Sequence, residues 1–262
     1  MDVTTKAGIN LHAVLRNMQE LCAIDEAASA VVKGKKITVK FTVKGCEPMA
    51  LAFNDGKCTY LRGEALNGEA LNGALKLYFS SPEKFNKLVD GGNVIPMFNI
   101  GGIPKLKFVL KDFGVISDRL SYYLQPKPEE AEELLKNKKY FEISTTLLAY
   151  TAFHALAEIG NTDPVGKEVA HRIGEGKINI EVVDGPAVAI IVKEGRLTAK
   201  IGLEPDPGAK MVFSNLEIVN RVLSGKTDAF SAMGAGLFNI SGRIHLLDEM
   251  NKLLSLVSKY LG

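Results

Sequence analysis

The second half of this 262-residue chain repeats the first. At an offset of 134 residues, seven positions carry the same residue in both halves: Lys76 and Lys210, Phe79 and Phe213, Ser80 and Ser214, Glu83 and Glu217, Asn86 and Asn220, Gly91 and Gly225, and Gly102 and Gly236. Composition alone would give about one or two identities in a window of roughly 27 positions. The repeating unit is about 125 residues, the size of one domain, so we predict two divergent copies of one small fold.

The boundary between the copies is predicted from a change in composition. The run Gln125-Pro126-Lys127-Pro128 is followed by the acidic run 129–133, which consists of glutamates apart from Ala131. Two prolines favour an extended stretch, and acidic side chains suit the first turn of a helix. We therefore expect one domain over residues 1–125, a linker over 126–139 and a second domain over 140–262.

Composition excludes several classes of protein. Apolar residues make up 46% of the chain, enough for real cores. The net charge is only +2 with acids and bases interspersed, which argues against a nucleic-acid binder, because such a protein needs a basic face. The odd set Cys22, Cys46 and Cys58 lacks the spacing of a zinc site or a disulfide framework, although Cys46 and Cys58 could face each other across a hairpin.

No segment reads as a membrane span or a secretion signal. The most apolar helical stretch, residues 145–159, is shorter and more polar than the roughly 20 apolar residues that cross a bilayer. The first residues lack the apolar core of a signal peptide. We expect a cytoplasmic protein.

Hydrophobic periodicity predicts the same order of elements in each half. In the first half we expect helices over 9–24 and 25–33, strands over 36–43, 49–53, 57–62 and 74–79, a helix capped by Ser80 with Glu83, a fifth strand over 104–110 and a closing helix over 113–124. In the second half we expect helices over 145–159 and 163–174, strands over 177–183, 187–193, 196–201 and 209–213, a helix capped by Ser214 with Glu217, a short helix near Phe230, a strand over 237–241 and a helix over 246–261. The predicted fold class is α+β, with two domains that each have a mostly antiparallel five-stranded sheet covered by helices on one face.

The apolar residues that periodicity turns inward are the candidates for a binding site. Methionine and phenylalanine suit a pocket for flexible apolar ligands, although an ordinary packed core gives the same periodicity and stays open as the simpler interpretation. The candidate ligand-binding residues are Phe213, Leu223, Phe230, Met233, Leu237, Ile240, Leu246, Met250, Leu254 and Val257 in the second copy and Phe79, Phe85, Met97 and Phe98 in the first. Ile100, Ile103 and Phe108 are expected to face inward with the last four.

No catalytic or metal-binding pattern is present in the sequence. His12 and His154 occupy equivalent places on apolar helices and are interpreted as structural histidines. No histidine pair has metal-ligand spacing, and the glycine pairs precede strands, which is the wrong order for a phosphate-binding loop. We expect no cofactor, no metal and no enzyme activity; an active site at His171, Arg172 or His245 ranks last among the hypotheses.

The second half contains a motif of three parts. It begins with Lys210-Met211-Val212-Phe213-Ser214, continues in residues 222–230 with Gly225-Lys226 and Asp228, and ends with Ala232, Gly236 and residues 239–242 with their Ser-Gly step. This motif resembles the sterol carrier protein 2 (SCP-2) sterol-transfer family. Gly225 is expected to end a helix in a left-handed conformation, Asp228 to cap the next helix and Gly236 to turn the chain into the last strand. The first half matches only through the repeat.

Where the first half departs from the pattern, its second short helix is in doubt. Gly92, Val94, Pro96 and Phe108 stand at the places of Lys226, Asp228, Phe230 and Gly242. Pro96 and the run 99–102 disfavour a helix there. A pocket entrance in this half could therefore be wider, narrower or absent.

The resemblance implies a function without catalysis. In that family a sheet covered by helices encloses an apolar tunnel, which implies that this chain binds or carries a sterol, a fatty acyl chain or another lipid. The alternative is a structural or oligomerisation module whose cores are filled by side chains. Expected partners are a small hydrophobic ligand and no nucleic acid; transient membrane contact and a homodimer remain open.

Overall fold

The computed structural model describes residues 1–67, 71–227 and 229–261. These residues form two compact units, which are described separately. The N-terminal unit is residues 6–143, and the C-terminal unit is residues 1–5 together with 144–262. The predicted domain limits at residues 125 and 140 stay predictions.

The N-terminal unit begins with a nearly continuous helical segment. It comprises α1 (Val3–Ile9), a π-helical turn (Asn10–Val14), a 3-10 turn (Leu15–Asn17) and α2 (Met18–Ile24), and α3 (Glu26–Val32) follows. The strands are β1 (Lys36–Val43), β2 (Met49–Asn54), β3 (Lys57–Arg62), β4 (Leu75–Phe79) and β5 (Met97–Phe98), with a 3-10 turn at Gly63–Leu66 and α4 (Pro82–Val89) between β4 and β5. A 3-10 turn (Ile100–Gly102), α5 (Ile103–Phe108), a π-helical turn (Val109–Phe113), α6 (Gly114–Leu124) and α7 (Pro128–Lys136) complete it.

The C-terminal unit repeats the order of strands and has a second, short helix between its fourth and fifth strands, where the described residues of the N-terminal unit have only α4. It comprises α8 (Lys138–Thr162), which starts in the N-terminal unit, then α9 (Pro164–Ile173), β6 (Gly176–Val182), β7 (Ala187–Lys193), β8 (Arg196–Ile201), β9 (Ala209–Phe213), α10 (Leu216–Leu223), α11 (Ala229–Gly234), β10 (Phe238–Gly242) and α12 (Ile244–Leu261). Tyr260 ties the first residues of the chain to this unit through two hydrogen bonds. Its hydroxyl donates to Asp163 Oδ2 over 2.6 Å and accepts from the backbone N–H of Asp2 over 3.0 Å.

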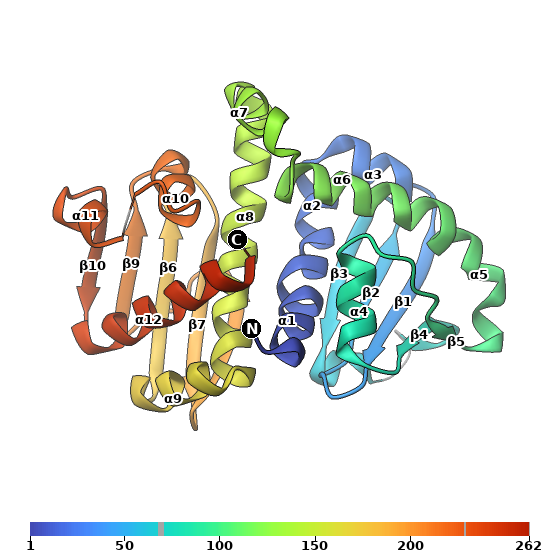
Figure 1. The fold of residues 1–262 in the computed structure, drawn as a ribbon, viewed down its shortest axis with the longest axis horizontal. Coiled ribbons are helices and arrows are strands. Elements are labelled where there is room, and N and C mark those ends of the chain that lie inside the picture. The colour runs from blue at the N-terminus through green and yellow to red at the C-terminus, as the bar shows by residue number, and fades with distance from the viewer. Residues whose placement is uncertain (68–70, 228, 262) are drawn as a thin grey trace. The chain divides into compact units, whose positions relative to one another are not determined.

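The two sheets have the same strand order. The first is β3-β2-β1-β4-β5 and the second, read from its other edge, is β8-β7-β6-β9-β10. In each sheet one pair of strands is parallel, β1 with β4 and β6 with β9, and the other pairs are antiparallel. The registers also agree, because Val43 pairs with Phe79 as Val182 pairs with Phe213. The predicted α+β class with mostly antiparallel five-stranded sheets is confirmed (Figure 1).

The predicted strand over 104–110 is wrong, because this segment is helical. The fifth strand is the two-residue β5, in which Met97 pairs with Tyr78. Asn99 ends the pairing: its Oδ1 accepts from the Lys76 N–H over 2.8 Å and its Nδ2 donates to the Ala74 carbonyl. Pro104 then occupies the first turn of α5, where proline is favoured.

The strand registers show which positions of the two halves are equivalent. Phe98 is the counterpart of Ile240, so the identity of Gly102 and Gly236 does not mark equivalent places.

Both predicted capping boxes lie one residue too early. The caps of α4 and α10 are Ser81, which accepts from the Lys84 N–H, and Asn215, which accepts from the Ile218 N–H. Gly225 and Gly236 have φ values of +70° and +67°, as predicted for a helix end and a sharp turn. The predicted cap Asp228 lies outside the described residues.

The cysteines do not pair as the hairpin hypothesis supposed. Cys58 lies opposite Phe53 in the β2–β3 register, and its thiol is hydrogen-bonded with Cys22 rather than Cys46. Cys22 and Cys58 are buried and Cys46 is half-buried. Burial raises the pKa of the Cys58 thiol. Both buried thiols therefore act as small core residues.

The end of β10 depends on glycine at position 242. Gly242 has a φ of +93°, and a Cβ built there would lie 2.3 Å from the carbonyl oxygen of Gly208. We expect Gly242→Ala to lower the free energy of unfolding of the C-terminal unit by about 2 kcal/mol, through strain at this φ and the close approach. Gly234→Ala is the control, because the space around Gly234 is open, and equal losses in chemical denaturation would contradict the prediction.

Candidate ligand-binding site

The helix-covered face of the second sheet carries an apolar layer, and part of the predicted site lies in it. Phe213 of β9 stacks between Phe238 and Phe153, with ring centroids 4.9 and 6.3 Å away. From α12, which contacts β9 and β10, the predicted residues Leu246, Met250 and Val257 are buried. Figure 1 shows α12 running across the strands of this sheet. The buried side chains of β9 and α12 thus meet on one face of the sheet.

A second group of predicted residues is only half-buried. Leu223 ends α10, Leu237 precedes β10, Ile240 lies in β10 and Leu254 lies in α12. These segments adjoin one another, because α11 contacts both α10 and β10, and β10 contacts α12. Phe230 and Met233 belong to α11, but their side chains lie outside the described part of the structure. Apolar side chains that are not fully buried therefore occur on α10, on α12, and in and just before β10.

In the N-terminal unit the predicted residues divide into two pairs. Phe79 and Phe85 are buried and pack edge to face, with centroids 5.0 Å apart. Met97 and Phe98 are 57% and 43% exposed, so the prediction that they belong to a buried inner layer is wrong. Met97 lies on the face away from the helices, whereas Phe98 pairs with the buried Leu77 on the helix side but is not covered there. The reason is that β5 is a short edge strand and no helix of the α11 kind follows α4 among the described residues.

Two of the three residues expected to face inward beside them are also exposed. Ile100 and Ile103 lie on the surface, whereas Phe108 is buried. Phe108 belongs to α5, and the centroid of its ring lies 5.1 Å from that of the Phe53 ring. Phe113 follows in the same helical segment and packs against Phe41 and Phe53. Four aromatic rings, those of Phe41, Phe53, Phe108 and Phe113, therefore pack on one another in the core of this unit.

His12 sits in a polar cluster on the inner side of β3. Its Nδ1 lies 2.8 Å from the Tyr60 hydroxyl and its Nε2 lies 3.0 Å from the Glu47 carbonyl. A carbonyl can only accept, so Nε2 carries the proton and Nδ1 accepts from Tyr60. Burial, and then the charge of Arg62, lower the pKa of His12 to about 3. This histidine is therefore neutral and structural, as interpreted from the sequence.

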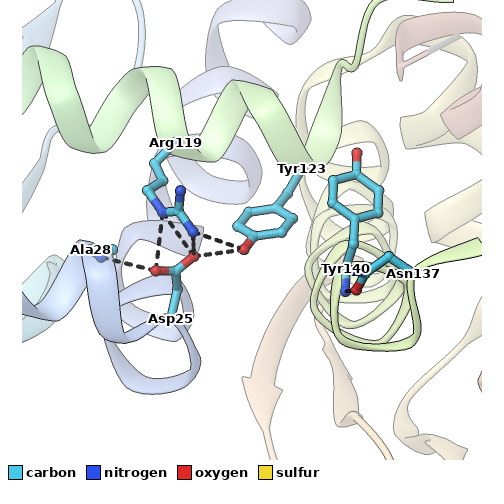
Figure 2. A network of polar contacts seen from close by, with 6 residues as sticks. All are labelled: Asp25, Ala28, Arg119, Tyr123, Asn137 and Tyr140. Carbon is cyan, nitrogen blue, oxygen red and sulfur yellow. Dashed lines mark hydrogen bonds and ion pairs between the residues drawn. The ribbon is translucent and has the colours of Figure 1, made fainter. Parts of the chain in front are cut away.

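A second polar cluster was not predicted from the sequence (Figure 2). The Arg119 guanidinium lies beside the buried carboxylate of Asp25, with Nε 2.9 Å from Oδ2. Tyr123 donates to the same oxygen over 2.7 Å, and the Ala28 N–H donates to Oδ1. Burial alone would raise the pKa of Asp25, but the hydrogen bonds from Arg119, Tyr123 and Ala28 outweigh it and hold this pKa at about 2. The cluster joins α3 to α6 and contains no reactive group aimed at a ligand.

The three residues considered for an active site show no catalytic arrangement. His171 of α9 packs against the turn at Gly195, and Arg172 pairs with Glu249 of α12 over 3.2 Å. His245 is exposed near the start of α12. Among the described residues, no three His, Cys, Asp or Glu side chains are placed to hold a metal ion. In the same part of the chain, no helix combines the length and apolar character needed to cross a bilayer.

Comparison with solved structures finds SCP-2 domains. The chain is similar to them over about two fifths of its length. A sterol carrier protein domain of Helicoverpa armigera has 19% identity and a TM-score of 0.36, with 43% of this chain and 89% of that chain covered. An SCP-2 ubiquinone synthesis protein, UbiJ, has 13% identity and a TM-score of 0.35, with 42% and 96% covered.

One match is to an enzyme. The sec-alkylsulfatase Pisa1 of Pseudomonas sp. has 15% identity and a TM-score of 0.31, with 65% of this chain and 31% of that chain covered. No family model and no curated protein matches the chain. Similarities at this level of sequence identity bear on the fold alone. The function is therefore inferred from the residues described above.

Proposed function

We propose that this chain binds and carries one hydrophobic ligand, such as a sterol, a fatty acyl chain or another lipid, without catalysing a reaction. The proposed site is the apolar layer of the C-terminal unit between its sheet and helices α10, α11 and α12. The observation that supports the proposal is that four apolar residues of these elements, Leu223, Leu237, Ile240 and Leu254, are only half-buried, and we infer that a ligand enters the apolar layer there. An apolar ligand entering there would lose its contact with water, at a gain of about 0.8 kcal/mol for each methylene buried.

The proposal assigns the N-terminal unit a supporting role. Its core contains the packed rings of Phe41, Phe53, Phe108 and Phe113, and two of the residues that were predicted to line a pocket, Met97 and Phe98, are exposed. This packing favours the second candidate function, a structural or interaction module with a side-chain-filled core, for this unit alone.

Leu254 tests the position of the ligand site. We expect Leu254→Gln to weaken the binding of a fluorescent fatty acid about tenfold, because an apolar wall of the site becomes polar and the loss of one leucine contact costs about 1.5 kcal/mol. The readout is a fluorescence titration of the full chain.

The matched control is Val165→Gln. Val165 is an exposed apolar residue of α9 in the same unit, outside the proposed site. Equal affinities of the two variants, both below that of the native chain, would mean that the effect is not local to the site. Native affinity in Leu254→Gln would place the ligand elsewhere.

A further inference from the structure

The face of the first sheet that turns away from the helices is basic. Lys40 lies directly opposite Lys76 in the β1–β4 register, and Lys36 and Lys57 both lie opposite Asn54 on β2. Residues paired in register point to the same side of a sheet, so the four lysines share one face. The other positions of this face are Thr, Ala, Asn, Leu, Tyr or Met. We call it the lysine face; it carries no carboxylate.

The charges of the lysine face are not neutralised within the described residues. None of the four lysines forms an ion pair there. Like charges directly opposite each other destabilise a sheet, and Lys40 with Lys76 is such a pair. An anionic partner would relieve this repulsion.

The corresponding face of the second sheet differs. There Asn179 occupies the place of Lys40, and Lys177 and Lys200 both pair with Glu204. The carboxylate of Glu181 lies on the same face. Lys193 and Lys210 also lie on this face of the second sheet, but its basic residues are accompanied by the carboxylates of Glu181 and Glu204. Among the described residues, a basic face without a carboxylate is therefore a feature of the first sheet.

Exposed apolar side chains continue from the edge of the lysine face. Tyr78 and Met97 pair on it at the edge strand β5. In the segment that includes this strand, Ile95 is 90%, Ile100 84% and Leu110 77% exposed. Residues 95–110 also include Lys105 and Lys107 and no acidic residue, and Lys111 follows directly. In Figure 1, β5 lies beside β4 with α5 close by. Large exposed apolar side chains mark interaction sites.

We propose that the lysine face and the apolar segment 95–110 dock on an anionic lipid membrane surface. Lysines attract the lipid head groups while isoleucine, methionine and leucine side chains enter the interface, the combination that peripheral membrane segments use. Nucleic acid is disfavoured as the partner because the face has no arginine and the exposed aliphatic side chains would have no counterpart. The proposal is independent of whether the C-terminal unit holds a ligand.

Sedimentation with vesicles tests the proposal in the full chain. We expect binding to vesicles of phosphatidylcholine with about a third phosphatidylserine, little binding to phosphatidylcholine alone, and weakening at roughly 0.5 M salt. Equal binding to both kinds of vesicle, or to neither, would overturn the proposal. So would binding of a single-stranded oligonucleotide without binding of anionic vesicles.

Matched variants test whether vesicle binding depends on the lysine face or only on the total charge of the chain. Lys40→Gln with Lys76→Gln should weaken vesicle binding roughly 30-fold. The control, Lys193→Gln with Lys210→Gln, removes the same charge from the second sheet and should leave binding within about twofold of the native value. Met97→Ser with Ile100→Ser should remove the binding that persists at high salt, since that part is apolar. Equal losses in the two lysine variants would contradict the assignment to this face.

Fatty acid binding by these variants keeps the two proposals distinguishable. All six substituted positions lie outside the proposed ligand site of the C-terminal unit. A variant of the lysine face or of segment 95–110 that keeps the native affinity for fatty acid but loses vesicle binding supports the docking surface. This result stands even if Leu254→Gln shows that the fatty acid binds elsewhere.

Discussion

Arg119→Met should lower the free energy of unfolding of the N-terminal unit by about 3 kcal/mol. The substitution keeps the length of the side chain but leaves the buried carboxylate of Asp25 without its charge partner, and such unpaired buried charges cost about 3–5 kcal/mol. Arg119 is about one-third exposed, which places the expected loss at the lower end. Five of the seven tyrosines lie within residues 6–143 and the chain has no tryptophan, so tyrosine fluorescence during urea unfolding reports mainly on this unit.

The double variant separates this pair from general damage to the fold. Asp25→Asn retains the oxygen that caps α3 through the Ala28 N–H and removes the charge. Combined with Arg119→Met, it should recover part of the loss, because no unpaired carboxylate is left. A double variant whose loss equals the sum of the single losses would contradict a direct interaction between the two side chains.

The pH dependence of the pair follows from the pKa of Asp25. This pKa is about 2 in the folded chain and near 3.9 in an unfolded one, so the stabilisation is present above about pH 4 and is lost as the pH falls from there towards 2. In Asp25→Asn this part of the acid dependence should be absent.

His12 should make the N-terminal unit less stable in mild acid. Its pKa is about 3 in the folded chain and near 6.5 in an unfolded one, so the unfolded chain binds a proton that the folded chain does not. The stabilisation is complete above about pH 6.5 and is lost progressively towards pH 3. Between pH 7 and 5 we expect a loss of about 2 kcal/mol from this residue.

The measurement is urea unfolding at a series of pH values, with His12→Gln as the comparison. Glutamine can still donate to the Glu47 carbonyl but does not titrate, and the other histidines are unchanged, so the difference in slope belongs to His12. Parallel slopes for the two proteins would contradict the low pKa, whatever the stability of the variant itself.

Elements with clear periodicity were predictable from the sequence. The alternation of residues 36–43 predicted β1 with its exact bounds, and β7, β8 and β9 were predicted as well. The capping residues were missed by one position, because Ser80 and Ser81 offer equivalent hydroxyls and Ser214 and Asn215 offer similar side-chain acceptors. Local patterns therefore decide which element forms, and tertiary contacts decide where it ends.

The segment around residues 95–113 was not predictable in the same way. Hydrophobic periodicity predicted a strand over 104–110, but strand pairing had already ended at Asn99. Periodicity also could not show that Met97 and Phe98 would lie on an edge strand without a covering helix. Apolar character alone does not distinguish a core position from a docking surface.

Sequence patterns located the apolar layer of the candidate site but not the polar clusters. Phe213 and Met250 were predicted by period and are buried, while Leu254, predicted by the same period, is only half-buried. Asp25 and Arg119 are 94 residues apart, and no local pattern links two residues at that separation. Their pairing follows only once α3 and α6 pack together.

The central claim is that one hydrophobic ligand is carried by the C-terminal unit, and native mass spectrometry tests it most directly. Freshly purified full-length chain would be measured, followed by organic extraction of whatever is bound and by a second measurement after addition of a fatty acid. The account predicts one adduct of lipid mass per chain, reduced in Leu254→Gln and unchanged in Val165→Gln. A bare protein that also ignores added fatty acid would contradict lipid carriage, and two adducts per chain would contradict the filled core of the N-terminal unit.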